Sequence, residues 1–223
     1  MKEPLPFVVA IDGPAASGKG TLARRLADRF GFAHLDTGAL YRATALLVLD
    51  QASDARDPAT AVAAARRVDM QMLSDPRLRE HAVSAAASVV AAIPAVRSIL
   101  LRLQRQFAAH PPAPAKGAVL DGRDIGSVVC PSADAKIFLT ASTAARARRR
   151  LAELRQQDAT AIYENVLQDM KERDARDSER PTAPLIAAPD AIVIETTTLD
   201  ADAVFRCACD LVERTLKEKE WQQ

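Results

Sequence analysis

An apolar strand that runs directly into a glycine-containing loop and then a helix constrains this fold more than any other stretch. Residues 7–11 (FVVAI) are apolar, the loop spans residues 13–18, and a helical pattern runs from Lys19 to Phe30. The spacing G-x-x-x-x-G-K is that of a phosphate-binding loop, in which backbone N–H groups and a helix start face one anion. A turn that contains glycines by chance would not require the flanking strand and helix, so we predict a nucleotide-phosphate site.

The residues of this loop have separate expected roles. Gly13 and Gly18 allow the backbone to bend around an anion, and Lys19 is expected to reach the β- and γ-phosphates. The residue after Lys19 is Gly20 rather than serine or threonine, so Thr21 becomes the candidate hydroxyl ligand for Mg²⁺. The expected nucleotide-binding set is therefore Gly13, Pro14, Ala15, Ala16, Ser17, Gly18, Lys19, Gly20 and Thr21.

Composition limits the possible partners. The chain has 223 residues, 26% of them charged, and its formal net charge is +1, so the charge balance does not indicate a nucleic acid or another polyanion as partner. No apolar run approaches the ~20 residues of a membrane helix, and the N-terminus lacks the long apolar core of a signal peptide. Three cysteines do not make a disulfide framework. We expect a cytoplasmic monomer that acts on small molecules.

Short apolar strands alternate with helical segments along the chain. Further strands are expected at residues 33–35, 118–120, 136–140 and 191–194, and residues 68–73 could form another. A helical region from residue 75 should break near Pro94 and end near Ala109, before a proline-rich linker at 110–117. This alternation favours an α/β fold with a parallel sheet covered on both faces, whose ligands gather at the carboxyl ends of the strands.

A second charged stretch lies far from the loop in sequence. On a helix, Arg173, Arg176, Asp177 and Arg180 would fall within one arc of about 100°. Such a face suits a phosphate and a sugar hydroxyl, although a solvated face of salt bridges would have the same pattern. The arginine run at 148–150 leaves the same two interpretations open.

Five motifs in register resemble those of the bacterial cytidylate kinase family: GPAASGKGT, DTGALYR, SVVAAIPAVR, DGRDIGSVVCP and ERDARDSER. The resemblance covers almost the whole chain and implies a P-loop nucleoside monophosphate kinase fold. This fold has a five-stranded parallel sheet with helices on both faces, a helical acceptor-binding insertion and a lid. It implies a core of residues 1–36, 116–150 and 181–223, a nucleoside monophosphate-binding region of residues 37–115, and a lid of residues 151–180.

The resemblance also implies a reaction, in which the γ-phosphoryl group of ATP passes to CMP or dCMP with Mg²⁺. By the same resemblance, Thr37 contacts the acceptor nucleotide, and Arg42, Arg123 and Arg180 hold its phosphate. Ser88, Arg97 and Asp124 would read the cytosine, and Arg173 and Asp177 would face the sugar. Phosphoryl transfer relies on positioning and charge stabilisation, so the expected catalytic residues are Lys19, Arg123, Arg150 and Arg180.

One departure and several alternatives accompany this prediction. Bacterial members of the family usually carry a small antiparallel sheet in the acceptor region, and residues 68–79 contain neither a hairpin turn nor an alternating strand pair, so this insert looks deleted. A GTPase would need an N-K-x-D stretch, but the single asparagine, Asn165, precedes Val166. A nucleic-acid-dependent ATPase would usually have a longer chain or a basic surface. A kinase of the same fold that acts on UMP, AMP or another metabolite stays open, as does a non-catalytic nucleotide-binding module.

Overall fold

A single parallel sheet organises the computed structural model, which describes residues 5–156, 160–180 and 182–220. All four strand pairs in this sheet are parallel, which confirms the expected α/β fold with five strands. The strands are β1 (Phe7–Asp12), β2 (Ala33–Asp36), β3 (Gly117–Gly122), β4 (Ala135–Thr140) and β5 (Ile192–Glu195), in the order β2-β3-β1-β4-β5. The predicted core and lid ranges extend over residues 1–4, 157–159, 181 and 221–223, which lie outside the described residues.

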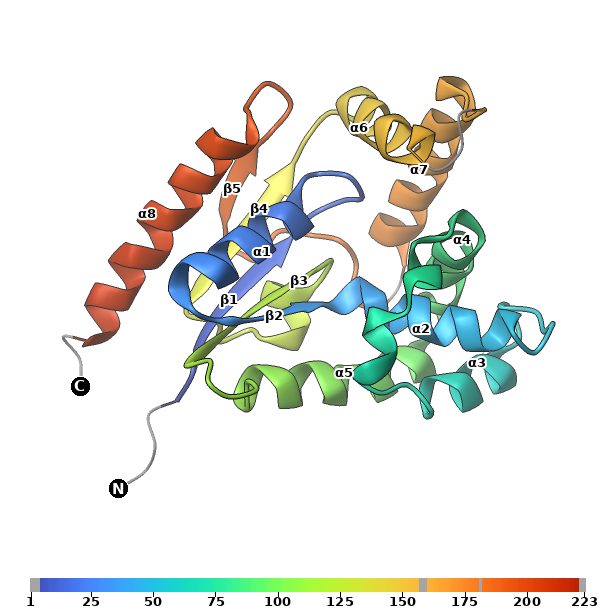
Figure 1. The fold of residues 1–223 in the computed structure, drawn as a ribbon, viewed down its shortest axis with the longest axis horizontal. Helices are drawn as coiled ribbons and strands as arrows, with labels where there is room; N and C mark the ends of the chain where they lie inside the picture. Colours follow the sequence, from blue (N-terminus) through green and yellow to red (C-terminus); the bar gives the residue numbers. More distant parts are fainter. Residues whose placement is uncertain (1–4, 157–159, 181, 221–223) are drawn as a thin grey trace.

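Helices pack against both faces of the sheet, as the apolar strands require (Figure 1). On one face, α1 (Lys19–Phe30) and α8 (Ala201–Glu220) share a core with alternate strand residues such as Val9 and Ile11. On the other face, Ala10 and Leu120 join a core with α2 (Thr37–Leu49) and α5 (Pro94–Ala109). The central strand β1 is therefore buried on both sides, and the loop that follows it has a rigid base.

The long excursion between β2 and β3 is helical. It comprises α2, α3 (Pro58–Ala65), η1 (Gln71–Ser74), η2 (Pro76–Arg79), α4 (His81–Val90) and α5. The expected strand at 68–73 was wrong, because the Asp69 carboxylate accepts the backbone N–H groups of Gln71 and Met72 at 2.8 and 3.1 Å and starts a 3-10 turn. All strand pairs of the described residues are parallel, so they contain no antiparallel insert. The break before Pro94 and the end of α5 at Ala109 agree with the prediction.

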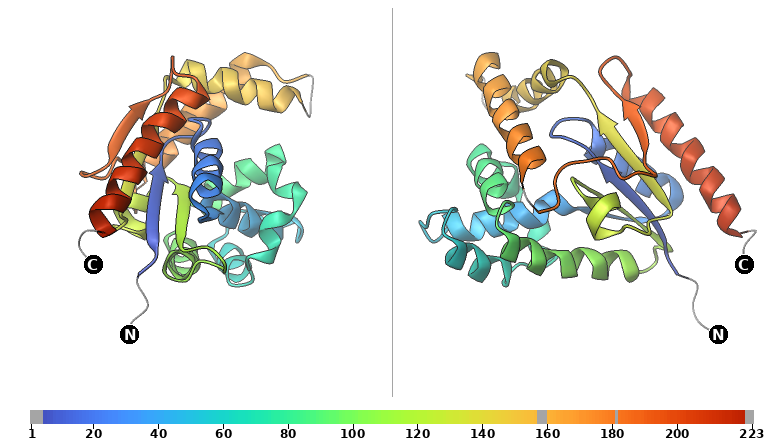
Figure 2. Two further views of the ribbon diagram at one scale, coloured as in Figure 1. Left: turned by 60° about the vertical axis from the view of Figure 1, so that its left-hand side comes forward. Right: turned by 180° about the vertical axis from the view of Figure 1, so that it is seen from behind.

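Two helices, α6 (Thr143–Arg155) and α7 (Tyr163–Glu179), pack together beyond the carboxyl ends of the strands. Figure 2 shows this pair as a group separate from the helices α2–α5. Within the described ranges no single helix is long and apolar enough to cross a membrane; α4 and α5 pass that test only as a pair bent by 103°.

Candidate active site

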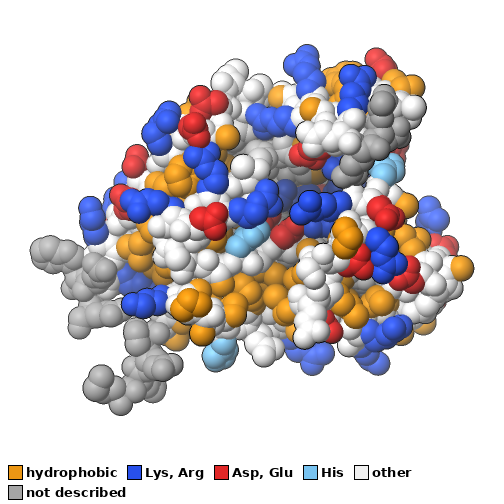
Figure 3. Space-filling model, viewed as in Figure 1, with side chains coloured by type: hydrophobic (Ala, Val, Ile, Leu, Met, Phe, Trp, Pro, Cys, Tyr) orange, Lys and Arg blue, Asp and Glu red, His pale blue; other side chains and the backbone are white. Residues whose placement is uncertain are grey.

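A cleft of about 610 Å³ opens at the carboxyl ends of the strands and is lined by residues of α6 and α7 and of α2, α4 and α5. Basic side chains gather along this hollow on the face shown in Figure 3. The cleft is lined by six residues of the predicted nucleotide loop, Ala15, Ala16, Gly18, Lys19, Gly20 and Thr21, whereas Gly13, Pro14 and Ser17 lie in the loop without lining it. The predicted acceptor-side and catalytic residues all line it as well, namely Thr37, Arg42, Ser88, Arg97, Arg123, Asp124, Arg150, Arg173, Asp177 and Arg180.

The phosphate-binding loop has the backbone that its glycines predict. Gly13 has a φ of 150°, and a Cβ atom there would lie 2.2 Å from the carbonyl oxygen of Leu139 in β4. Gly18, the residue before α1, has a φ of 94°, a left-handed conformation that favours glycine. The loop therefore depends on glycine both for conformation and for its close approach to β4.

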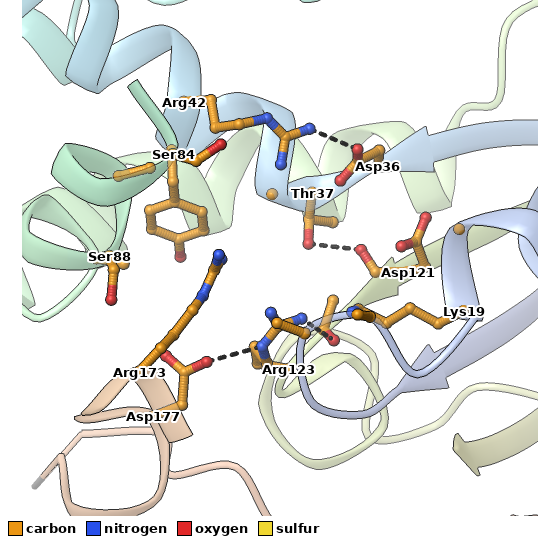
Figure 4. Close-up of a pocket in the computed structure, with 18 of the residues that line it drawn as sticks. Lys19, Asp36, Thr37, Arg42, Ser84, Ser88, Asp121, Arg123, Arg173 and Asp177 are labelled. Carbon is orange, nitrogen blue, oxygen red and sulfur yellow. Dashed lines mark hydrogen bonds and ion pairs between the residues drawn. The ribbon is translucent and has the colours of Figure 1, made fainter. Parts of the chain in front are cut away.

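Lys19 lies at the start of α1 with its side chain directed into the cleft (Figure 4). Its Nζ donates to the carbonyl of Pro14 at 3.0 Å. Burial lowers the pKa of Lys19 to about 7, and the positive charge of Arg123 acts in the same direction. An anion beside this ammonium group would offset both effects, so the site favours a phosphate.

Arginines converge on the acceptor side of the cleft (Figure 4). Arg42 donates to Asp36 at 2.6 Å and Arg123 donates to Asp177 at 2.9 Å. Burial and the neighbouring Arg123 lower the pKa of Arg173 to about 10. The Nε of Arg173 and the Nη2 of Arg180 are buried and have no hydrogen-bond partner among the described residues. These donors fit a dianionic phosphate.

Asp177 shows how strongly the arginines polarise this part of the cleft. Burial acts to raise its pKa, but Arg123 and Arg173 hold the pKa below its ordinary value. Of the four residues predicted on one helical arc, Arg173, Asp177 and Arg180 line the cleft. Arg176 instead donates from its Nε to Ser88 Oγ at 3.2 Å. Three of the four positions on the arc therefore face the cleft.

A buried ion pair occupies the other end of the acceptor side. Arg97 of α5 donates to Asp124, which follows β3, at 2.6 Å, and both side chains are 8% exposed. The Arg97 guanidinium lies 5.4 Å from the ring centre of Tyr41, and Arg180 Nη2 lies 3.7 Å from Asp124 Oδ1. An acceptor and a donor are thus side by side, which is the combination that the edge of cytosine requires.

Neither Asp36 nor Thr37, the residues at the start of α2, caps the helix with its side chain. Thr37 is buried, and its Oγ1 donates to the backbone carbonyl of Asp121 at 2.8 Å. Asp36 pairs with Arg42 instead. Both side chains face the cleft rather than the N–H groups of the helix (Figure 4).

The three arginines at 148–150 have different surroundings. Arg148 is exposed, and Arg149 donates to the side chain and the carbonyl of Thr196. Arg150 lines the cleft, and it forms an ion pair with Glu153 at 3.0 Å. Only one of the three arginines therefore lies where a nucleotide phosphate could meet it.

Two acidic residues with clear roles were missed from the sequence. Oδ1 of Asp121 in β3 lies 2.7 Å from His34 Nε2, whose N–H donates to it. Its other oxygen lies beside Gly20 at the start of α1. The carboxylate of Asp121 and the hydroxyl of Thr21 are hard oxygen donors at the same end of the cleft. They fit Mg²⁺, which takes few protein ligands and completes its shell with nucleotide phosphates and water.

Asp12, at the end of β1, was also missed. Its two carboxylate oxygens accept the backbone N–H groups of Ile125 and Gly126, each at 2.7 Å. These residues begin η3 (Ile125–Val129), one turn of π-helix directly after Asp124. Arg123 and Asp124 lie directly before this turn, and the phosphate loop directly follows β1. The hydrogen bonds of Asp12 therefore hold these two parts of the site together. The one sequence signal was a carboxylate between an apolar strand and Gly13.

We expect Asp12 to make stability depend on pH. Burial raises its pKa to about 6, so between about pH 4 and 6 the folded state holds a proton that the unfolded state has lost. The free energy of unfolding should therefore fall by about 3 kcal/mol as pH rises through this window, relative to an Asp12→Asn variant. Urea unfolding of both proteins from pH 3.5 to 7.5 measures this difference, and parallel curves would contradict it.

Comparison with known proteins is consistent with this geometry. Residues 9–214 match the family model described as cytidylate kinase. A cytidylate kinase of Rhodospirillum rubrum is 55% identical over 206 residues, which cover 92% of this chain and 97% of that protein. One from Methylocella silvestris is 54% identical over 207 residues, covering 93% and 94%. A gluconokinase structure from Sinorhizobium meliloti has a TM-score of 0.51 at 14% identity, with 99% of each chain covered, and supports the fold alone.

Proposed function

Since this chain belongs to the cytidylate kinase family, we propose that its cleft carries out the transfer of a phosphoryl group from ATP to CMP or dCMP with the residues described above. The chain is an ATP-dependent nucleoside monophosphate kinase, and the donor nucleotide would lie along the loop at 13–21 with its phosphates near Lys19. The acceptor would lie between α4, α5 and α7. This arrangement brings the two phosphates together at the middle of the cleft.

The charges of the cleft explain how the transfer would be accelerated. Phosphoryl transfer spreads negative charge over the moving oxygens, so positioned cations lower the barrier with no covalent step. Lys19 would hold the transferring group. Arg42, Arg123 and Arg180 would hold the acceptor phosphate, while Arg173 and Asp177 would face the sugar. Mg²⁺, held by Thr21 and Asp121, would supply further charge neutralisation on the donor phosphates.

The base would be read by Ser88, Arg97 and Asp124. A carboxylate can accept a hydrogen bond from the 4-amino group of cytosine, and a guanidinium can donate hydrogen bonds to N3 and O2. The observation that carries the proposal is the buried pair of Arg97 and Asp124, 2.6 Å apart, at the end of a cleft that has a phosphate loop at its other end. A phosphate loop without this pair would fit many kinases.

The domain ranges proposed for the enzyme are a core of residues 1–36, 116–150 and 181–223, an acceptor region of 37–115 and a lid of 151–180.

The direct test of function is ADP release by the purified protein with ATP, Mg²⁺ and a panel of acceptors. We expect release with CMP and dCMP, much slower release with UMP and AMP, and little without acceptor. Equal release without an acceptor, or a faster reaction with UMP or AMP, would contradict the proposal.

A further inference from the structure

Arg146, in the first turn of α6, uses every hydrogen-bond donor that it has. Its side chain is 4% exposed. Nε donates to the carbonyl of Ala141 at 2.9 Å, and Nη2 donates to Thr143 Oγ1 at 3.0 Å and to Asp174 Oδ2 at 2.6 Å. Nη1 donates to Asp174 Oδ1 at 3.1 Å and to the carbonyl of Ala15 at 3.3 Å. A guanidinium group has five donors, so Arg146 has none left for a nucleotide phosphate.

The partners of Arg146 belong to both halves of the cleft. Ala15 lies in the phosphate loop, on the donor side. Asp174 lies in α7, directly after Arg173 and one turn before Asp177, which line the acceptor side. One planar guanidinium group therefore joins the phosphate loop to the helix that carries two acceptor-side residues, and its bidentate bond to Asp174 fixes their relative geometry.

A second contact from the same helix reaches the loop one turn later. Arg149 donates to Thr196, and the Thr196 hydroxyl donates in turn to the carbonyl of Ser17 at 3.2 Å. Two outward-facing carbonyls of the loop, those of Ala15 and Ser17, are thus held from α6. In the proposed enzyme the N–H groups of the same loop must face a phosphate, so an element that holds the carbonyls also orients the N–H groups.

We propose that Arg146 is a positioning residue that couples the donor and acceptor halves of the cleft. A change in the position of α7 is transmitted through Asp174 and Arg146 to the carbonyl of Ala15, and a phosphate in the loop acts back on α7 along the same contacts. Occupation of the donor site therefore raises the affinity of the acceptor site, and the reverse holds by linkage. This inference rests on the proposed function, because it takes the two ligands to be ATP and CMP.

A stabilising buried ion pair would have the same distances, so stability alone does not test the proposal. The test is the ratio of the CMP dissociation constants without and with saturating ADP, measured by calorimetry on the full chain. ADP places two phosphates against the loop but has no γ-phosphoryl group to transfer. Couplings between two sites typically change affinity by about 5- to 150-fold, and we expect the wild type to lie in this range.

The decisive variants change a pair of residues that does not line the cleft. Asp174→Asn keeps the shape of the side chain and removes its charge, and Arg146→Lys keeps a charge but loses the bidentate bond. Both should bring the ratio of dissociation constants to within about 2-fold of one, and the double variant should do no more, because the two residues act as one unit. Arg148→Met, on an exposed position of the same helix, is the matched control and should retain the wild-type ratio.

The outcomes separate the possible explanations. If the wild type binds CMP but shows no coupling, or if folded Asp174→Asn and Arg146→Lys proteins keep the wild-type ratio, the positioning role is wrong and the pair is structural. If the wild type does not bind CMP at all, the proposed function itself fails. Circular dichroism and thermal unfolding identify any variant that has not folded, and in that case Asp174→Asn, the more conservative change, decides.

Discussion

Replacing Lys19 with alanine is expected to lower kcat by about 10²-fold or more while the protein stays folded. The ammonium group lies at the start of α1, 3.0 Å from the carbonyl of Pro14, and is the one lysine that lines the described cleft. Its removal takes a positive charge away from the transferring phosphates, whose negative charge is redistributed over the moving and leaving oxygens at the transition state. The loss should therefore appear in kcat more than in the KM for CMP, which steady-state kinetics measure separately.

The control for this variant is a lysine whose ion pair is structural and lies at the amino ends of the strands, away from the cleft. Lys219 of α8 bonds to Asp134 at 2.7 Å, and Asp134 accepts the N–H of Val8 near the start of β1. Lys219→Ala should lose some stability and keep its kcat. If a well-folded Lys19→Ala protein retained near-normal turnover, the assignment of Lys19 to the phosphates would be wrong.

Discrimination between CMP and UMP is the second large effect. Uracil presents a carbonyl where cytosine has its 4-amino group, and it carries a proton on N3, so Asp124 would face an acceptor and Arg97 a donor. A buried site that leaves such groups unpaired can reject the wrong ligand by ~10⁴-fold in kcat/KM. Asp124→Asn should narrow this gap, chiefly through a loss of activity on CMP, because an amide can turn to donate to O4 of uracil.

A purely structural role for Asp124 would give a different result. In that role Asp124 would cap the turn after β3, but its side chain forms no cap, and Asp12 accepts the hydrogen bonds from the N–H groups of Ile125 and Gly126. The matched control is Asp177→Asn, since Asp177 is an equally buried carboxylate that pairs with Arg123 in the same cleft. This variant should weaken CMP and UMP alike. An unchanged ratio of kcat/KM for CMP and UMP in Asp124→Asn would exclude it as the base reader.

Local patterns were sufficient to predict most of the fold. The strand at 7–11, the loop and α1 form a contiguous unit whose geometry is set by its own glycines, so it could be read without any tertiary information. The parallel sheet followed from the alternation of apolar strands and helices. Residues 68–73 misled because their apolar side chains alternate loosely, whereas the Asp69 side chain bonds to the backbone two and three residues ahead and starts a tight turn.

The site was predicted best where a motif carries it and worst where distant segments meet. The positions of Lys19 and Thr21 in the cleft could be predicted from spacing alone. The contacts of Asp12, Asp174 and Arg146 could not be predicted in this way, because their partners are distant in sequence. The most distant partner is 114 positions away for Asp12, 28 for Asp174 and 131 for Arg146. Arg146 and Arg148 are two arginines of the same helix, α6. Only the packing of α6 against the loop and α7 makes the first buried and leaves the second exposed to solvent.

The pair proposed to read the base, Arg97 and Asp124, is divided between two parts of the chain. Arg97 belongs to the excursion between the neighbouring strands β2 and β3, while Asp124 belongs to the sheet end itself. A graft of residues 37–115 from a kinase with another acceptor would therefore replace the guanidinium and leave the carboxylate behind. A buried charge without its partner costs roughly 3–5 kcal/mol. A change to a new acceptor therefore requires paired changes, one within residues 37–115 and one after β3. Exchange of the acceptor region alone would not be enough to change the acceptor.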